Sequence, residues 1–405
     1  MSAPVSPDKI AKPLCFQINL QAGFGGGEVF TAFFSKALLA AGWETILFAR
    51  PNARFFKELE LDAAITVHPV GGIGELLDQL PPQPAIIVSH ALLPAEWAIR
   101  IRSRGHFLIY FAHMPLYDFS PETYRGCDLI FAVSQHVIDS IKDAKLDHYY
   151  PVPFYGVADF SRSGGATAIL ERSVYDWDKR KFRDRVLSYL YPVYFSVKPK
   201  RQFTRRKGLT LGIVSRLTPI KQFPLMFELL VPVIRKYPSI NIEIFGSGGY
   251  ASVRDLKRAL APVADQVRWW GHQRDVKAVY PQLDFLLAGL PEKEALGLNI
   301  IEAQVCGTPV LAVNAPPFIE TVLEGETGFF YTDPRRDGGR DFARLLDALL
   351  ATGGKYPDPR KAMAHLERFS LAQFAQRVKN AMTTVHARHI AIAEVALRAP
   401  EHIYP

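Results

Sequence analysis

Short apolar segments alternate with longer amphipathic segments along both halves of this 405-residue chain. Apolar runs of this length are typical of buried strands, and amphipathic stretches are typical of helices that cover a sheet. The alternation predicts two α/β domains, each built around a parallel sheet. The expected strands are 14–20, 45–49, 85–89, 106–111 and 129–133, then 210–214, 241–245, 267–270, 283–290 and 309–313. The expected helices include 28–41, 94–104, 222–236, 252–260 and 371–397.

The length and hydropathy of the chain are those of a two-domain protein that folds in water. A mean hydropathy of +0.03 and 48% hydrophobic residues are typical of globular proteins, and 405 residues can bury two sizeable cores. No stretch approaches the roughly 20 apolar residues that cross a bilayer, and the N-terminus lacks the apolar core of a secretory signal. Cys15, Cys127 and Cys306 are scattered, which predicts free thiols in a reducing compartment. We therefore expect a cytoplasmic protein.

The positive charge of the chain is concentrated in one segment. The net charge is +8, and residues 171–207 hold twelve Lys or Arg against four Asp or Glu, a difference that equals the whole net charge. The rest of the sequence is balanced, so no general affinity for nucleic acid is expected. The segment is also rich in Tyr, Phe and Trp, which suit an anionic membrane surface. We expect peripheral membrane contact there; the alternative is a solvated helix whose rings pack on the first domain.

Two glutamates, Glu294 and Glu302, lie between the strands expected at 283–290 and 309–313. Glu294 follows a strand end, and Glu302 lies in a short helix that Asn299 is expected to cap. The N–H groups at the start of this helix can bind phosphate, and the two carboxylates can accept hydrogen bonds from sugar hydroxyls. The pattern therefore predicts a nucleotide-sugar site. The structural alternative is a capping box of Asn299 and Glu302, with Glu294 as a solvated loop charge.

A glycine-rich turn, Gly23-Phe-Gly-Gly-Gly-Glu28, links the first expected strand to the first helix. Glycines at such a turn let backbone N–H groups approach a diphosphate closely. A nicotinamide dinucleotide site would need a third glycine where Glu28 stands and an acidic residue where Arg50 stands, so this alternative is disfavoured. A structural turn without a ligand is the other alternative.

Basic residues follow the strand expected at 210–214 in the sequence Ser215-Arg-Leu-Thr-Pro-Ile-Lys221. Arg216 offers a planar fork for phosphate oxygens, and Lys221 offers a mobile positive charge. Together they can neutralise a diphosphate at the carboxyl edge of a sheet. The alternative is ordinary surface charge.

Three of these segments resemble signatures of retaining glycosyltransferases of family 4 (glycosyltransferase group 1). The glutamate segment is similar to the family's Glu-(x)7-Glu motif, the basic segment to its Arg…Lys motif, and the glycine turn to its N-terminal motif. The matching segments are 26–28 with 41–45, 215–222 and 294–310, and the departures within them are Ser215, Gln222, Leu296 and Gln304.

The resemblance implies the GT-B fold, with two Rossmann-like, doubly wound parallel-sheet domains facing a cleft. We expect an acceptor-side domain at 1–205 with a basic and aromatic insertion at 161–205. A donor domain is expected at 206–380, and a C-terminal helix at 381–405 is expected to cross back to the first domain. The implied reaction moves a hexosyl unit, with retention, from a nucleotide-diphosphate sugar to a hydroxyl of a glycan or lipid-linked acceptor. Cell-surface polysaccharide or lipopolysaccharide synthesis is the expected context.

The resemblance also assigns roles to the candidate residues. The diphosphate is expected to be bound by Arg216 and Lys221 and by the backbone N–H groups of Gly25, Gly26, Gly27, Gly297, Leu298 and Asn299. Glu302 is expected to bind the ribose, while Glu294 and His113 orient the transferred sugar as the catalytic residues; His90 is a second choice. A nucleotide-sugar epimerase or hydrolase and a non-catalytic sugar-nucleotide binder are the alternatives.

The segment Asp176-Trp-Asp178 has the spacing of the metal motif in another glycosyltransferase fold. It lies in a stretch expected to be a basic helix, where both aspartates can pair with neighbouring Lys and Arg residues. No cluster with metal-ligand spacing occurs elsewhere in the sequence. We therefore expect an enzyme that requires neither a metal nor a cofactor.

Overall fold

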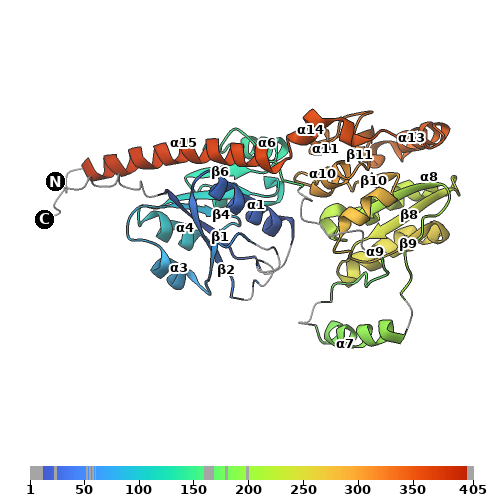
Figure 1. Cartoon of the computed structure of the whole chain (residues 1–405), viewed down its shortest axis with the longest axis horizontal. Helices are drawn as coiled ribbons and strands as arrows, with labels where there is room; N and C mark the ends of the chain where they lie inside the picture. The colour runs from blue at the N-terminus through green and yellow to red at the C-terminus, as the bar shows by residue number, and fades with distance from the viewer. Residues whose placement is uncertain are drawn as a thin grey trace, which may run out of the picture. The chain divides into compact units, whose positions relative to one another are not determined.

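The chain folds into two units, each built on its own sheet (Figure 1). The computed structural model describes residues 12–21, 25–51, 61–158, 168–177, 181–197 and 200–398, together with residues 53, 56 and 59. The first unit comprises residues 1–157 and 371–405, and the second comprises residues 158–370. No helix in this described part of the chain is both long enough and apolar enough to cross a bilayer.

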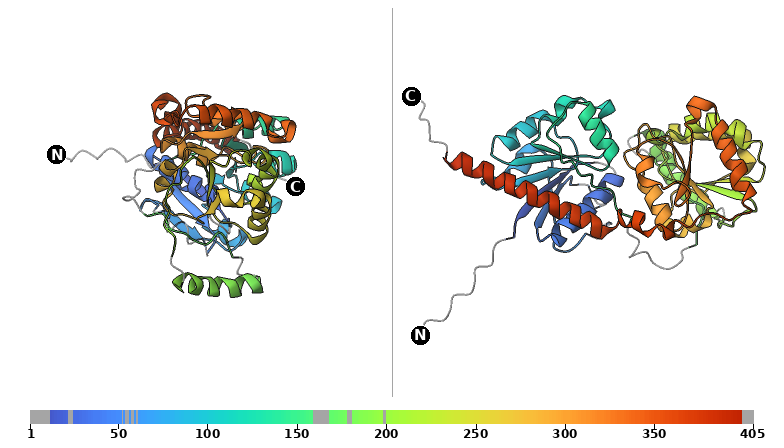
Figure 2. Two further views of the ribbon diagram at one scale, coloured as in Figure 1. Left: turned by 90° about the vertical axis from the view of Figure 1, so that its right-hand side faces the viewer. Right: turned by 90° about the horizontal axis from the view of Figure 1, so that it is seen from above.

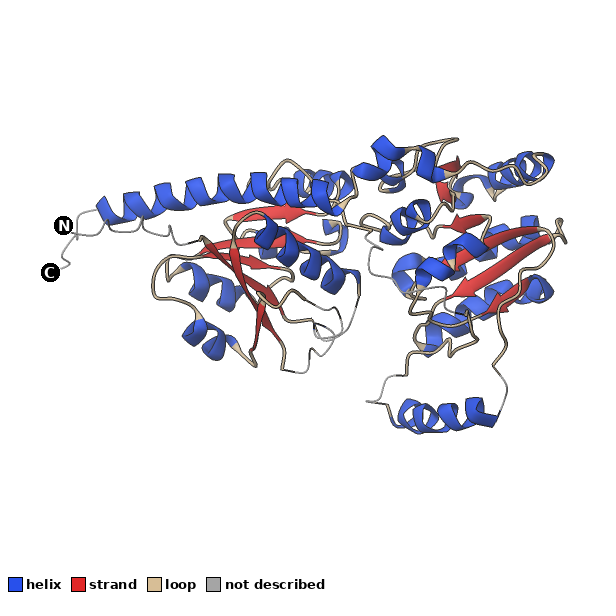
Figure 3. Cartoon of the chain, in the orientation of Figure 1, coloured by secondary structure: helices blue, strands red, loops and turns tan. Residues whose placement is uncertain are grey.

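The first unit contains a six-stranded parallel sheet in the order β3-β2-β1-β4-β5-β6 (Figure 3). Its strands are β1 (Leu14–Asn19), β2 (Glu44–Ala49), β3 (Thr66–Pro69), β4 (Ile86–Ser89), β5 (Phe107–Ala112) and β6 (Leu129–Ala132). Every residue of β4, β5 and β6 is buried, as in parallel sheets that are covered by helices on both faces. Five strands are those predicted from the sequence, and β3 was not predicted.

Helices cover both faces of this sheet. They are α1 (Gly26–Ala40), α3 (Ile73–Gln79), α4 (Ala95–Arg102), α5 (Pro121–Tyr124), α6 (Gln135–Asp143) and the long α15 (Leu371–Arg398). Buried Phe30, Phe34 and Leu38 recur every four residues along α1, which gives this helix its apolar face. The α15 helix packs along α1, with the rings of Phe30 and Phe374 5.3 Å apart, and Figure 2 shows it running the length of the first unit.

The second unit contains a six-stranded parallel sheet in the order β12-β11-β10-β7-β8-β9. Its strands are β7 (Leu209–Val214), β8 (Ile240–Phe245), β9 (Val267–Trp269), β10 (Phe285–Leu287), β11 (Val310–Val313) and β12 (Gly328–Tyr331). Its helices are α7 (Phe182–Val197), α8 (Phe223–Ile234), α9 (Tyr250–Leu260), α10 (Leu298–Val305), α11 (Phe318–Thr321), α12 (Pro334–Asp337), α13 (Arg340–Ala351) and α14 (Met363–Glu367). The strand β12 was not predicted.

Both sheets have the strand order 3-2-1-4-5-6 of doubly wound nucleotide-binding folds. The order reverses between β1 and β4 in the first unit and between β7 and β10 in the second. Ligands of such sheets bind beyond the carboxyl ends of the strands at this reversal. The prediction of two Rossmann-like, doubly wound parallel sheets is confirmed.

The division of the chain differs from the boundaries predicted after residues 205 and 380. The segment before β7 belongs to the second unit, because the Arg172 N–H donates to the Trp270 carbonyl at 2.9 Å and Tyr175 forms a β-bridge with Gly248. The helix that belongs to the first unit begins at Leu371 rather than at residue 381. Both sets of contacts join residues far apart in sequence, which composition does not reveal.

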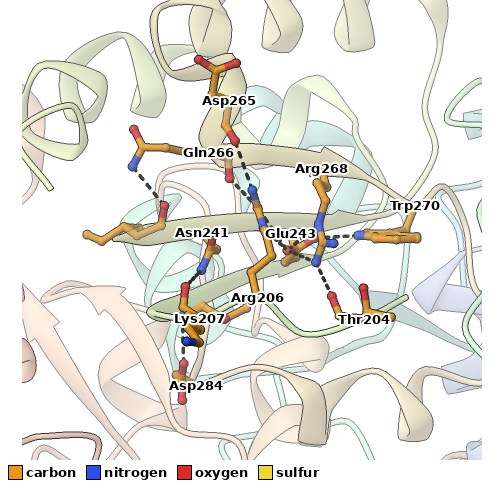
Figure 4. A network of polar contacts seen from close by, with 12 residues as sticks. Thr204, Arg206, Lys207, Asn241, Glu243, Asp265, Gln266, Arg268, Trp270 and Asp284 are labelled. Atoms are coloured by element: carbon orange, nitrogen blue, oxygen red, sulfur yellow. Dashed lines mark hydrogen bonds and ion pairs between the residues drawn. The ribbon is translucent and has the colours of Figure 1, made fainter. Parts of the chain in front are cut away.

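A buried carboxylate fixes the chain segment that enters β7 (Figure 4). Glu243 on β8 is fully buried and accepts hydrogen bonds from the Arg206 Nε at 3.2 Å, the Arg268 Nη2 at 2.6 Å and the Trp270 Nε1 at 2.7 Å. The Arg268 Nη2 also donates to the Thr204 carbonyl at 2.7 Å. Two cations and one indole therefore converge on a single carboxylate and tie residues 204–206 to β8 and β9.

The helix expected around Asp176 begins later than predicted. Asp176 lies in an extended stretch, where its N–H donates to the Gly248 carbonyl at 2.8 Å, and α7 starts only at Phe182. The interpretation of Asp176 as an intrahelical partner of basic residues is therefore wrong, because a strand-like contact to the loop after β8 holds it. Asp178 lies outside the described residues.

Candidate functional site

Three loops meet beyond the carboxyl ends of β7, β8 and β10 in the second unit. The loop after β7 contacts the loop after β8 through the Leu217 N–H, which donates to the Ser247 carbonyl at 2.8 Å. It contacts the loop after β10 through the Leu290 N–H, which donates to the Lys221 carbonyl at 3.3 Å. The meeting point lies where the strand order reverses, the position at which such sheets bind nucleotides.

Two glycines allow these loops to approach one another. A Cβ atom at Gly246 would lie 1.9 Å from the Ser215 carbonyl oxygen, and one at Gly289 would lie 2.3 Å from the Lys221 carbonyl oxygen. Both distances are far inside van der Waals contact, so any larger residue would force the loops apart. These glycines therefore set the spacing of the loops that carry Arg216, Lys221 and Glu294.

Lys221 and Glu294 form an ion pair across this junction. Lys221 ends the 3₁₀ turn η2 (Pro219–Lys221), and Glu294 lies in the loop between β10 and α10. The two side chains are only 19% and 14% exposed, so water screens their attraction less than it screens a surface pair. The sequence predicted both residues for the site but did not predict that they contact each other.

Glu302 lies on α10 and accepts a hydrogen bond from the Tyr280 hydroxyl at 2.8 Å. Removal from water raises the pKa of the Glu302 carboxyl to about 7, although the Tyr280 hydrogen bond and the Lys221 charge oppose this shift. Tyr280 is itself fully buried, and the Thr308 hydroxyl donates to its carbonyl at 2.6 Å. Sequence reasoning missed Tyr280, which lies in an unpatterned stretch before β10.

The helix α10 starts differently from the prediction. Gly297, not Asn299, occupies the N-cap position, with a φ of +82° that glycine adopts readily. Leu298 is the first helical residue, and the Asn299 side chain donates to the Val214 carbonyl at 3.2 Å. The expected capping box of Asn299 and Glu302 is therefore wrong. In the sequence, Gly297 was the available signal for the helix start, because glycine readily adopts the positive φ of this N-cap position.

The start of α10 supplies N–H donors three positions after Glu294 in the sequence. The first N–H groups of a helix have no acceptor within the helix, which gives its start a partial positive charge. Gly297, Leu298 and Asn299 supply these donors, and the Asn299 side chain fixes them to the end of β7. Arg216 follows the end of β7 by two positions, and its side chain is exposed.

The glycine turn of the first unit opens α1. Gly25 is the N-cap residue, in extended backbone, and Gly26 and Gly27 are the first helical residues. A Cβ atom at Gly26 or Gly27 would meet no heavy atom of the described residues within 4 Å. Local packing therefore does not explain these two glycines. Gly23 lies outside the described residues.

His113 lies close to the start of α1. Its ring is 5.0 Å from the Phe30 ring on α1 and 5.1 Å from the Phe111 ring at the end of β5. Burial lowers the pKa of His113 to about 4, so the ring is neutral near pH 7. Its Nε2 is buried, and no residue within the described ranges hydrogen-bonds to it.

His90 is held by a different set of contacts. Its Nε2 lies 3.0 Å from the Gln17 Oε1, and burial lowers its pKa well below the usual value. Its ring centroid is 5.7 Å from that of His113.

Arg50 is the residue that stands where a nicotinamide dinucleotide site would need an acid. Its Nε donates to the Leu20 carbonyl at 2.5 Å.

The structure thus brings the predicted residues together in two groups. The second unit gathers Lys221, Glu294, Gly297, Asn299 and Glu302, and the first unit gathers the glycine turn and His113. No group of three or more His, Cys, Asp or Glu side chains suited to a metal ion occurs among the residues that the structure describes. The second unit thus places a lysine, a helix N-terminus and two carboxylates on elements that follow β7 and β10.

Sequence comparisons match the region that carries this second group. Residues 197–364 match the family of glycosyl transferases group 1. An uncharacterized glycosyltransferase of Haemophilus influenzae is 28% identical over 176 residues, which cover 43% of this chain and 48% of the relative. A D-inositol 3-phosphate glycosyltransferase of Rhodococcus erythropolis is 29% identical over 173 residues, which cover 40% of this chain and 38% of the relative. The chain spans about half or less of the length of these curated relatives.

Structural comparison covers nearly the whole chain. The Anabaena protein HepE, solved in complex with UDP and glucose, matches with a TM-score of 0.66 and 17% identity over 92% of this chain and 100% of that chain. At this identity the likeness concerns the fold, and it confirms the predicted GT-B fold. The family match and the relatives named as glycosyltransferases support a transferase. Residues 197–364 thus match the glycosyltransferase group 1 family, in a chain that has the GT-B fold.

Proposed function

We propose that the protein transfers a hexosyl unit from a nucleotide-diphosphate sugar to a hydroxyl of a glycan or lipid-linked acceptor. The observation that carries the proposal is the grouping of Lys221, Glu294 and Glu302 at the start of α10. A cation and helix N–H groups suit a diphosphate, and carboxylates beside them suit sugar hydroxyls. A glycosyltransferase group 1 domain covers the same residues.

The leaving diphosphate is the group that the site must stabilise. Negative charge grows on it as the glycosidic bond breaks, and preorganised donors lower the energy of that state. Lys221, Arg216 and the backbone N–H groups of residues 297–299 are the donors in this proposal. Because these charges come from the protein, we propose a reaction that requires no metal.

The two carboxylates have separate roles in the proposal. Glu302 accepts hydrogen bonds from the ribose hydroxyls, with Tyr280 holding one of its oxygens at 2.8 Å. Glu294 orients the transferred sugar and is released for this task when phosphate draws Lys221 away. In a retaining reaction the departing phosphate itself accepts the proton of the incoming hydroxyl on the same face of the sugar.

In the first unit, His113 and the start of α1 are the proposed contacts. The neutral His113 ring has a buried Nε2 without a hydrogen-bond partner among the described residues, a group suited to a sugar hydroxyl. No described atom lies within 4 Å of a Cβ placed on Gly26 or Gly27, which suits the close approach of a phosphate to the backbone. We propose a cytoplasmic enzyme that acts in cell-surface polysaccharide or lipopolysaccharide synthesis.

A donor panel tests this proposal. UDP, GDP, ADP and their hexose conjugates are added in thermal-shift assays with and without EDTA, and a solved protein of this fold with bound UDP makes uridine the first base to try. A specific ligand at a hundredfold excess over its Kd stabilises by about 2.7 kcal/mol. We expect one nucleotide to raise the Tm and EDTA to leave the shift unchanged.

Product analysis separates the remaining alternatives. Turnover of the donor without any acceptor would indicate an epimerase or a hydrolase, and donor binding without turnover in any acceptor mixture would indicate a silent binder. No shift with any nucleotide would contradict the proposed donor site. Radiolabelled sugar transferred to lipid or glycan extracts, with retained anomeric configuration by NMR, is the expected result.

A further inference from the structure

The helix α7 presents an apolar face to solvent. Phe182, Tyr189 and Leu190 are 74%, 72% and 57% exposed, and Val186 is 40% exposed. Their positions i, i+4, i+7 and i+8 place all four on one side of the helix. Figures 1 and 2 show α7 standing out from the sheet of the second unit. Four large apolar side chains on one exposed face form a patch of the kind that marks an interaction site.

Residues beside and opposite this face contact the rest of the second unit. Asp184 is 4% exposed and pairs with Arg183, whose guanidinium lies 4.2 Å from the centre of the Tyr250 ring at the start of α9. The Tyr191 ring lies 5.7 Å from the Trp177 ring. These contacts orient α7 while its four apolar side chains remain exposed.

The charges around this face are positive. Lys181, Arg183 and Arg185 are exposed, and Asp184, the acidic residue of the helix, is buried. Elsewhere in residues 171–207, Arg201 pairs with Glu171, Arg205 with Asp284 and Arg206 with Glu243. Because Arg183 pairs with Asp184, Lys181 and Arg185 supply the positive charge beside the apolar face of α7.

We propose that this face of α7 binds the surface of an anionic lipid bilayer. The helix lies in the interface, with Phe182, Val186, Tyr189 and Leu190 turned to the acyl chains and Lys181 and Arg185 at the lipid headgroups. A stable protein interface buries about 800 Å² per partner, more than one narrow helix face supplies. A bilayer needs only such a face together with positive charge.

The contacts of the preceding segment connect this surface to the candidate site. Tyr175 bridges to Gly248, and the neighbouring Ser247 accepts the hydrogen bond from Leu217 in the loop after β7. The segment that leads into α7 therefore contacts the loop after β8, which borders the candidate site. The membrane inference does not depend on the transfer reaction, because it concerns a separate surface and is tested without donor or acceptor.

Vesicle flotation tests the inference with the full chain. Vesicles of phosphatidylglycerol and phosphatidylcholine are compared with pure phosphatidylcholine at low and high salt. The native chain is expected to float with the anionic vesicles at low salt. A Phe182→Ser, Tyr189→Ser, Leu190→Ser variant is expected to lose at least about tenfold in partitioning, because the buried apolar area drives interfacial binding. Each of Lys181→Ser and Arg185→Ser is expected to cost about fivefold.

Matched controls use exposed apolar residues elsewhere. Ile99→Ser and Met363→Ser remove side chains that are 67% and 75% exposed on α4 and α14, and they are expected to leave partitioning unchanged. A second measurement places an environment-sensitive fluorophore on Leu190→Cys, or on Met363→Cys as its control, in a Cys306→Ser background. Only the probe at position 190 is expected to shift its emission to the blue with anionic vesicles.

Three results would overturn the inference. The native chain would fail to float with anionic vesicles at low salt, or the triple serine variant would float as well as the native chain. The third is a native dimer in sedimentation velocity that the triple variant converts to a monomer, which would assign the face to a second copy of this chain. Unchanged nucleotide thermal shifts in the variants would show that the donor site and the membrane surface are independent.

Discussion

Lys221 and Glu294, 73 positions apart in the sequence, are joined in an ion pair between the loops after β7 and β10. In this ion pair each group neutralises the other. A diphosphate that approaches Lys221 competes with Glu294 for the ammonium, so phosphate binding is expected to release the carboxylate for sugar hydroxyls. Phosphate and sugar recognition are thereby coupled through one pair of side chains.

Substitution of Glu294 by Gln is expected to separate these two tasks. The variant leaves Lys221 without its competing carboxylate, so nucleoside diphosphate should bind several-fold more tightly by calorimetry. The transfer rate should fall about a hundredfold, since the sugar loses a positioning contact. Glu292→Gln, in the same loop but paired with Arg335, is the control and should leave both quantities unchanged. Unchanged diphosphate affinity together with a transfer rate within a few fold of the native rate would exclude the proposed role of Glu294.

The raised pKa of Glu302 has a defined effect on stability. Its folded-state pKa of about 7 exceeds the ordinary value of 4.5, so the folded chain holds this proton more tightly than the unfolded chain. The resulting stabilisation is complete below about pH 4.5 and is lost as the pH rises through 7. Glu302→Gln should remove this loss, so the Tm difference between variant and native chain should grow in the variant's favour from pH 5 to pH 8. A constant difference across that range would contradict the raised pKa.

Tyr280→Phe tests how Glu302 is held. The Tyr280 hydroxyl donates to the Glu302 carboxylate and opposes the upward shift of its pKa, so its removal should raise that pKa further. Nucleotide binding that requires the ionised carboxylate should then begin at higher pH. The measurement is nucleotide affinity against pH in the variant and the native chain. A purely structural tyrosine would lower stability but leave the midpoint of this pH profile in place.

Much of the fold could be predicted from sequence because buried parallel strands are continuous apolar runs. The strand β3 escaped prediction because three of its four residues are exposed, so it has no apolar run. The strand β12 begins with Gly328, where a Cβ would lie 2.3 Å from the Val310 carbonyl oxygen; this demand for glycine comes from packing, which sequence patterns do not show.

The sequence predicted which residues belong to the candidate site, but it did not predict which of them contact one another. Motif spacing identified Lys221, Glu294 and Glu302, because each follows or precedes a recognisable strand. The partners of these residues depend on which loops the sheet order brings together. Tyr280 reaches Glu302 from a stretch without periodicity, and no local pattern indicates that its hydroxyl points at a carboxylate 22 positions away.

Gly26 and Gly27 provide a test that separates ligand binding from folding. A Cβ at either glycine would meet no atom of the described residues within 4 Å, and both lie in α1, where alanine is the better helix former. Gly27→Ala is therefore expected to leave stability unchanged or raise it by about 0.5–1 kcal/mol. If a phosphate approaches the backbone here, the same variant should lower the transfer rate at least about tenfold. A more stable variant with full activity would contradict the proposed approach of a phosphate to the backbone at this turn.

Glu243→Gln should destabilise the second unit without touching the candidate site. The change leaves Arg206 and Arg268 converging on a neutral amide, and removal of one partner from a buried ion pair costs about 3 kcal/mol. Glu228→Gln, an exposed change on α8, should cost less than about 0.5 kcal/mol. Urea unfolding measures both values. Equal stabilities of the two variants would show that the contacts of Glu243 drawn in Figure 4 do not stabilise the segment that enters β7.

Gly246→Ala should separate the loops of the candidate site. Its Cβ would lie 1.9 Å from the Ser215 carbonyl oxygen, so the loop after β7 must move away from the loop after β8. Such overpacking costs about 1–3 kcal/mol, and the displaced loop carries Lys221, so nucleotide affinity should fall together with the Tm.

Gly249→Ala is the control, because it lies three positions further on, where an added Cβ meets no described atom within 4 Å. It should cost at most about 1 kcal/mol, for the loss of a favourable N-cap residue, and leave nucleotide affinity intact. Equal losses of nucleotide affinity in the two variants would contradict the inference that the close contact of Gly246 with Ser215 sets the position of the loop after β7.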